Sequence, residues 1–157
     1  MANSTAIASS FKAELMLGAH QLGTVTIVSR GSLTAPTTDT LKAALYVTTG
    51  SIGASTTTYS STNEVSGTGY TAGGVTVTNA TAPQTGGGTT GFWTPSAAIV
   101  YSTVTLTTAF DTVLLYNSTQ SNRAILSYNF GSTTVTAGTL TLNMPTNASG
   151  TALITLS

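Results

Sequence analysis

Beyond Gly23 the chain is built from short runs in which aliphatic residues alternate with threonine and other small residues. The run GTVTIVSRG (23–31) sets Val25 and Ile27 against threonines, and TLKAALYVTTG (40–50) repeats the pattern. Successive side chains of a strand point to opposite faces, so this period of two predicts strands with one buried face. In the second run the expected inward face carries Leu41, Ala43, Leu45 and Val47.

Several later runs extend the same pattern to the end of the chain, at 73–83, 90–119, 123–131, 138–145 and 150–157. The run 90–119 is expected to hold two or three strands, separated by Pro95, by TTAFD (107–111) and by NST (117–119). No crossover helices are available to link parallel strands. We therefore predict a mainly β fold of roughly eight or nine short strands, an antiparallel β-sandwich or a jelly-roll-like barrel.

One segment, SSFKAELMLGAHQLG (9–23), has the spacing of a helix. Ser9 or Ser10 is expected to cap it. Its apolar residues are predicted to pack on the domain or to contact a partner; they are Phe11, Leu15, Met16 and Leu22. The length of 157 residues fits one domain, with a helix or arm at 1–23 and a β-sandwich at 24–157.

Charge is scarce, with four basic and four acidic residues and a formal net charge of zero. Such a surface offers no electrostatic footprint for nucleic acid or an anionic membrane. Threonine hydroxyls replace charge as the solvating groups, but they leave strand edges poorly protected against pairing with another chain. The composition therefore favours assembly with copies or partners. We expect no signal peptide and no membrane span, because the start lacks a basic segment and a long apolar one.

Two segments are loops by composition, SIGASTTTYSSTNEVSGTGYTAGG (51–74) and TAPQTGGGTTG (81–91). The first is long enough to be a functional loop, and the second is predicted to be a hairpin tip. The glycines of the first loop are expected to serve positive φ angles or a close backbone approach. The residues singled out for loop structure or an interface are Glu64, Gly67, Gly69, Tyr70, Gly73 and Arg123.

Glu64 is the only charged residue of that loop, and two roles are open to it. Its carboxylate can accept hydrogen bonds from backbone N–H groups of the loop, which is the interpretation we favour. Alternatively, it can pair with Arg123 or Lys42 across strands or subunits.

Titratable groups are too few to indicate catalysis. His20 is the sole histidine, the four acids are far apart in the sequence, and no cysteine is present. The spacing fits neither a metal site nor a nucleophilic triad, so no cofactor and no enzymatic activity are predicted.

Five segments carry a resemblance to a known family: SFKAELMLGAH, DTLKAALYVT, TYSSTNEVSGTGYTAGG, LLYNSTQSNRAILSYNFG and GTLTLNMP. They resemble a group of small virion structural proteins of tailed bacteriophages, some of which are similar to capsid decoration, or cement, proteins. The resemblance implies a component of the virion without catalysis.

From this resemblance we expect a protein that forms a small oligomer, a trimer, on the outer capsid surface and stabilises the lattice of the major capsid protein. It would be made in the cytoplasm of the bacterial host. The alternative is a tail, fibre or receptor-binding protein whose aromatic residues meet a carbohydrate; these are Tyr59, Tyr70, Phe92, Trp93 and Tyr101. A cell-wall hydrolase is disfavoured, because it needs two carboxylates in one cleft.

Overall fold

The computed structural model describes residues 3–16, 19–23, 37–85 and 90–157. Its fold is mainly β, with two antiparallel sheets and one short N-terminal helix, which confirms the predicted β-sandwich class. The predicted strand around Val25 and Ile27 lies outside the described residues.

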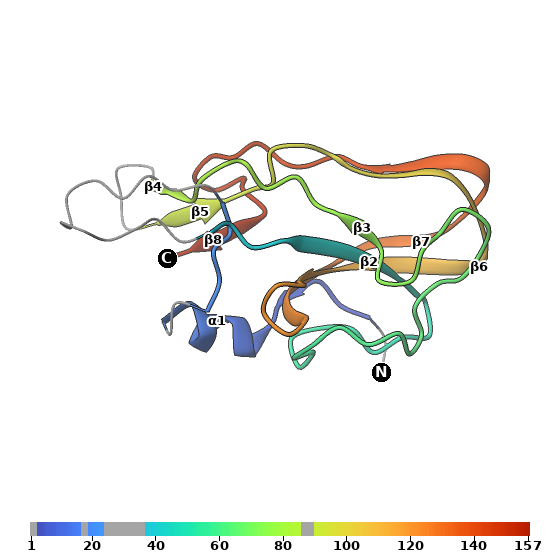
Figure 1. Ribbon diagram of the computed structural model, residues 1–157, viewed down its shortest axis with the longest axis horizontal. Helices are drawn as coiled ribbons and strands as arrows, with labels where there is room; N and C mark the ends of the chain where they lie inside the picture. The colour runs from blue at the N-terminus through green and yellow to red at the C-terminus, as the bar shows by residue number, and fades with distance from the viewer. Residues whose placement is uncertain (1–2, 17–18, 24–36, 86–89) are drawn as a thin grey trace.

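The larger sheet has five strands in the order β1-β7-β6-β2-β3, and the smaller has three in the order β4-β5-β8 (Figure 1). The elements are β1 Ala6–Ile7, α1 Ser9–Met16, β2 Leu41–Val47, β3 Val75–Thr76, β4 Gln84–Thr85, β5 Gly91–Trp93, β6 Ile99–Asn117, β7 Arg123–Leu142 and β8 Ile154–Leu156. All their pairings are antiparallel.

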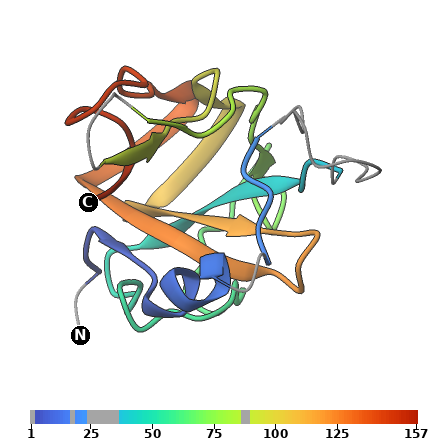
Figure 2. The same cartoon turned by 90° about the vertical axis from the view of Figure 1, so that its left-hand side faces the viewer.

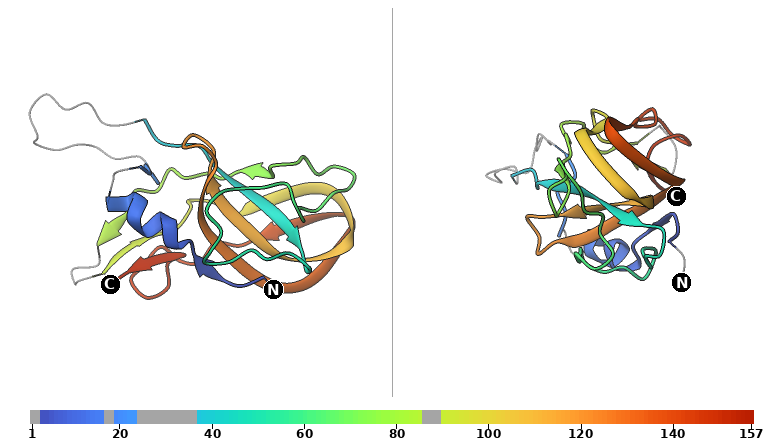
Figure 3. Two further views of the ribbon diagram at one scale, coloured as in Figure 1. Left: turned by 90° about the horizontal axis from the view of Figure 1, so that it is seen from below. Right: turned by 90° about the vertical axis from the view of Figure 1, so that its right-hand side faces the viewer.

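A single long hairpin, β6 with β7, forms most of the larger sheet and bends over, so that its two halves lie in different layers. In Figure 1 the two strands run together through the lower layer, turn at the right-hand end and return along the upper side. The right-hand view of Figure 3 separates these halves into two layers. The prediction of breaks at TTAFD (107–111) and between 131 and 138 is therefore wrong, because both strands continue through these segments.

The hairpin bends because both strands are irregular at the same place. Thr103 in β6 has a φ of 52° and Ala137 in β7 a φ of 46°, and the register shifts on either side of Val104. A positive φ is unusual for any residue with a side chain and more so for a β-branched one. Bulges of this kind bend a strand and increase its twist.

β2 is buried on both faces, whereas the sequence predicted one. Leu41, Ala43 and Leu45 are fully buried, and so are Ala44 and Tyr46 from the opposite face. The strand pairs with β6 on one side and β3 on the other.

The helix α1 ends at Met16, earlier than predicted, and residues 19–23 are not helical. Neither serine caps it as expected, because Ser9 and Ser10 both lie inside the helix. The helix packs against β7 on the lower side of the molecule (Figure 2). Phe11 and Leu22 are buried in the core and Leu15 packs against it, so these residues contact their own chain. The side chain of Met16 is outside the described part.

Candidate functional site

Glu64 is the anchor of the loop 51–74. Its Oε1 accepts hydrogen bonds from the Tyr70 hydroxyl at 2.7 Å and from the Gly73 N–H at 2.8 Å. Its Oε2 accepts one from the Tyr59 hydroxyl at 2.7 Å. The backbone bond to Gly73 was expected from the sequence, and the two tyrosine bonds were not. Charge-assisted hydrogen bonds of this kind are among the stronger ones in proteins.

Five of the six tyrosines surround this carboxylate. Tyr59 stacks on Tyr116 with ring centroids 4.7 Å apart, and Tyr70 stacks on Tyr101 at 6.0 Å. Three of the hydroxyls donate to backbone carbonyls: Tyr46 to Ser60, Tyr101 to Ala43 and Tyr116 to Gly73. The loop is thereby fastened to β2 and β6, the strands that carry Tyr46, Tyr101 and Tyr116.

The ionisation of these tyrosines is suppressed. Burial raises the pKa of Tyr59 and Tyr70 far above the ordinary value, and the hydrogen bonds to Glu64 raise it further. Burial likewise raises the pKa of Tyr46, Tyr101 and Tyr116. The negative carboxylate disfavours a second negative charge beside it.

The glycines of the loop allow it to lie directly on the bend of β6. A side chain at Gly67 would overlap the carbonyl oxygen of Thr105, and one at Gly69 would overlap that of Thr103. Gly69 and Gly73 also have positive φ angles of 78° and 89°. Both predicted uses of these glycines, positive φ and close approach, are therefore present.

Arg123 meets the loop 51–74 through its backbone, in an antiparallel bridge with Thr58, but its side chain does not pair with Glu64. In the described part of the chain, neither Arg123 nor Lys42 forms an ion pair with Glu64, so the alternative role for Glu64 is not seen between strands of one chain. Arg123 instead pairs with Glu14 of α1. Burial would raise the pKa of the Glu14 carboxyl, but hydrogen bonds from His20 and Arg123 outweigh it, and the pKa is lowered.

A second polar cluster joins this helix end to the β6–β7 turn. His20 Nε2 lies 2.7 Å from Glu14, and His20 Nδ1 lies 3.0 Å from Asn117 Nδ2. The same amide nitrogen donates to Asp39 at 2.6 Å, while Asn117 Oδ1 accepts two backbone N–H groups. Asn117 Nδ2 is thus the donor to both neighbours. His20 Nδ1 must then be an acceptor, and its Nε2–H donates to Glu14.

This cluster brings together two acids that the sequence places far apart. Glu14 and Asp39 are 6% and 5% exposed, and the His20 side chain has no exposed surface. Both ring nitrogens of His20 are occupied. The polar segment YNSTQSNR supplies Asn117 and Arg123 on either side of one turn, and of these two residues the sequence indicated only Arg123.

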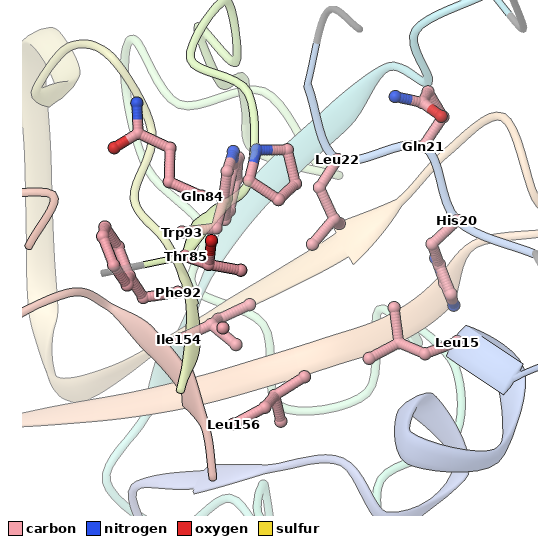
Figure 4. Close-up of a pocket in the computed structure, with 12 residues that line it drawn as sticks. Leu15, His20, Gln21, Leu22, Gln84, Thr85, Phe92, Trp93, Ile154 and Leu156 are labelled. Carbon is pink, nitrogen blue, oxygen red and sulfur yellow. The ribbon is translucent and has the colours of Figure 1, made fainter. Parts of the chain in front are cut away.

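An apolar pocket of about 460 Å³ lies beside this cluster (Figure 4). Leu15 and Leu22 line it together with residues of β5 and β8, among them Phe92 and Leu156. His20 and Gln21 also line it, but neither Glu14 nor Asp39 does. The buried acids therefore do not face this pocket.

Three of the five aromatic residues proposed to meet a carbohydrate are buried, and Tyr59 and Tyr70 are half-buried. Trp93 and Tyr101 are 1% exposed and Phe92 is 7% exposed. The Trp93 indole N–H donates to the Thr81 carbonyl at 2.7 Å, which ties it into the core. Tyr59 and Tyr70 use their hydroxyls on Glu64.

A larger apolar groove of about 610 Å³ opens between the two halves of the hairpin. Its lower wall carries Val113, Leu115 and Tyr128, and its upper wall Ile99 and Leu142. Met144 and Leu153 also line it. We call this space the hairpin groove. Tyr128 stands at its rim with 48% of its surface exposed, the largest fraction among the exposed large apolar residues of the described chain.

The outer edge of β7 borders the same groove. β1 pairs with this edge only at Leu126 and Ser127, and Thr5 hydrogen-bonds to Asn129. Within the described ranges, no strand pairs with the outer edge from Phe130 to Leu142, which we call the open edge. Unpaired strand edges present backbone donors and acceptors to other chains.

The surface around these features carries little charge. All four carboxylates accept internal hydrogen bonds; for Asp111 the donors are Asn3 and Thr112. After Arg123 the sequence contains no Asp, Glu, Lys, Arg or His. The open edge and the upper half of the hairpin therefore carry no ionic groups.

Comparison with known proteins provides no further assignment: no family model, curated protein or solved structure matches the chain. Over the described ranges, no three His, Asp or Glu side chains gather where they could hold a metal ion. No described helix combines the length and apolar character needed to cross a membrane.

Proposed function

We propose that this chain is a non-enzymatic structural protein of a phage virion, a capsid decoration protein that oligomerises on the outer capsid surface. The observation that supports this most is the open edge of β7 beside the hairpin groove. Together they present unpaired backbone groups and apolar area on one side of the molecule. Contiguous apolar surface and unprotected strand edges mark interaction sites.

The distribution of charge supports the same function. A protein that stays free in solution benefits from net charge, whereas this chain uses its few carboxylates for internal hydrogen bonds. Its outward strand faces carry threonine. Such a surface can pack against neighbouring subunits without burying unpaired charge, which is costly.

Attachment to the major capsid protein would be multivalent. An oligomer that contacts several capsid subunits at once binds far more tightly than one copy, because each later contact is intramolecular. Modest contacts by each copy would then be sufficient to stabilise the lattice.

A hydrolase receives little support from the acids, although Glu14 and Asp39 share one cluster. Glycosidases place two carboxyl groups on either side of a substrate, with a cleft between them. Here both acids are buried and satisfied, and the nearby pocket is lined mainly by apolar residues.

The test is the copy number and position of the protein in purified virions. We expect copies in the hundreds, in fixed proportion to the major capsid protein, by quantitative mass spectrometry. Labelling with a specific antibody should decorate the head. A handful of copies at the tail would favour the fibre or receptor-binding alternative, and absence from virions would contradict both.

A further inference from the structure

The open edge of β7 lacks the usual protection against pairing. Strand edges are commonly guarded by charged side chains, proline or bulges. From Phe130 to Leu142 there is neither a charged residue nor a proline. The irregularities lie at Gly131 and Ala137, which have positive φ angles of 87° and 46°. They divide the edge and leave a straight piece after Ala137.

That straight piece is Gly138–Leu142. Its residues Leu140, Thr141 and Leu142 pair in unbroken register with Tyr101, Val100 and Ile99 of β6. Leu140 and Leu142 pack on the core, while Thr139 and Thr141 are exposed on the other face. Five residues is close to the ordinary length of a strand. A register shift separates Leu140 from Gly138, but its extra residue lies in β6 and not in β7. The piece is therefore long enough to pair with another strand.

The neighbouring groove adds apolar surface beside the straight piece. Leu142 belongs to both the straight piece and the wall of the hairpin groove. Tyr128 projects at the rim of the same groove. A projecting aromatic residue and an apolar hollow on one face can exchange across a two-fold axis, where each copy offers the same patch to the other.

We propose that Gly138–Leu142 pairs antiparallel with the same segment of a second copy, which joins the two larger sheets into one. This contact makes a dimer, in place of the trimer that the resemblance implies. A second copy fits better than a charged partner, because the edge offers no ionic group that would select one. The hairpin grooves of the two copies then lie on either side of the shared strands, each covered by the other copy. The inference rests on the proposed structural role, since it names the contact by which copies meet.

Pairing centred on Leu140 predicts which side chains lie opposite each other. Thr139 of one copy faces Thr141 of the other, and the converse holds across the axis. Like charges in directly opposite positions destabilise a strand pair, and opposite charges stabilise it. The two threonines can therefore test the contact without disturbing the core, because both are exposed.

The experiment compares three proteins by light scattering coupled to size exclusion, over a series of concentrations. They are the unchanged chain, a Thr139→Lys/Thr141→Lys variant and a Thr139→Glu/Thr141→Glu variant. We expect the unchanged chain to form a dimer. The dimer of each charged variant should have a dissociation constant at least about ten-fold higher. A mixture of the two charged variants should form a one-to-one heterodimer.

Thr155→Lys is the matched control. Thr155 is an exposed threonine on β8, an edge strand of the smaller sheet. This variant should dimerise like the unchanged chain. Thermal unfolding of all variants, followed by circular dichroism, verifies that each one folds.

Several outcomes would overturn the inference: a monomer at every concentration, a trimer, or charged variants that dimerise as tightly as the unchanged chain. The inference would also be overturned if a mixture of the two charged variants formed no heterodimer. Binding to shells of the major capsid protein is measured separately by sedimentation. Shell binding by a strict monomer would reject this contact and leave the proposed function intact, whereas a dimer that binds no shells would reject the proposed function alone.

Discussion

The Tyr70 hydroxyl donates a 2.7 Å hydrogen bond to Oε1 of Glu64. The same hydroxyl accepts a bond from the Leu45 N–H of β2 at 3.0 Å, so it connects the loop carboxylate to the sheet. A central strand and a long loop are therefore held together through one side chain. Three donors in all converge on the carboxylate.

Replacing Glu64 with Gln should loosen this loop. A glutamine presents an NH₂ group to at least one of the donors, and the remaining bonds lose their charge assistance. We expect the free energy of unfolding to fall by about 2 kcal/mol, measured by urea denaturation. Hydrogen exchange should quicken over residues 59–74.

Ser66→Ala is the control for this change, because Ser66 is exposed on the same loop. It should shift the free energy of unfolding by less than about 0.5 kcal/mol. Equal exchange rates in Glu64→Gln and the unchanged chain would show that the carboxylate does not hold the loop.

A glycine pair separates the effect of backbone conformation from that of close approach. Gly69 and Gly150 have similar φ angles of 78° and 87°, but a side chain at Gly69 would strike the Thr103 carbonyl, whereas Gly150 has open space. Gly150→Ala should cost about 1–2 kcal/mol from the left-handed conformation alone. Gly69→Ala should cost distinctly more. Similar midpoints of thermal unfolding for the two variants would contradict the seating of this loop on the bend of β6.

Stability should fall at alkaline pH. The tyrosines around Glu64 have raised pKa values in the folded state, so their hydroxyls stay protonated when those of the unfolded chain ionise near pH 10. The unfolded state then binds fewer protons than the native state. The free energy of unfolding should thus hold up to about pH 10 and decline above it, by about 1.4 kcal/mol per pH unit for each such tyrosine.

The measurement is the absorbance of ionised tyrosine during a pH titration, followed together with circular dichroism. Most of the absorbance change should coincide with unfolding. Ionisation of most tyrosines in a chain that keeps its β signal would contradict the buried cluster.

The lowered pKa of Glu14 predicts that stability also falls at acidic pH. Its pKa is lowered in the folded state, so its contribution to stability is present above the unfolded value of about 4.5 and disappears as the pH falls through the folded value. The Glu14→Gln variant should be less stable than the unchanged chain at neutral pH, and it should lose less stability on acidification.

The Arg123→Gln variant should lower the free energy of unfolding by no more than about 1 kcal/mol, because the Arg123 side chain is 45% exposed.

Urea unfolding between about pH 2 and 7 measures both effects. Lys12→Gln is the control, because Lys12 is exposed on the same helix and forms no ion pair within the described residues. Parallel pH profiles for Glu14→Gln and the unchanged chain would show that the ion pair does not contribute to the acid response.

Local pattern was sufficient to predict the β class and the strand at Leu41–Val47. It also placed a hairpin tip at 81–91, although Gln84–Thr85, inside that predicted loop, is itself a strand paired with β5. It failed where a strand bends. Thr103 and Ala137 take positive φ angles that neither residue favours, so the sequence gives no sign that β6 and β7 run on through the bend. Tertiary packing imposes that conformation.

The sequence predicted the type of hydrogen bond that Glu64 forms, but it did not predict which residues meet in the polar clusters. A lone carboxylate among glycines indicated backbone hydrogen bonds, and Gly73 provides one. The meeting of Glu14, Asp39 and Asn117 depends on contacts between residues up to about a hundred positions apart. Such distances in sequence leave no periodicity to detect.

The bent hairpin also has a mechanical consequence. Because β6 and β7 pass without interruption from one layer to the other, tension on either layer is carried to the other by the covalent backbone of both strands. Separation of the two layers would therefore require both strands to be disrupted. Under tension we expect the molecule to unfold in one event and not by gradual extension.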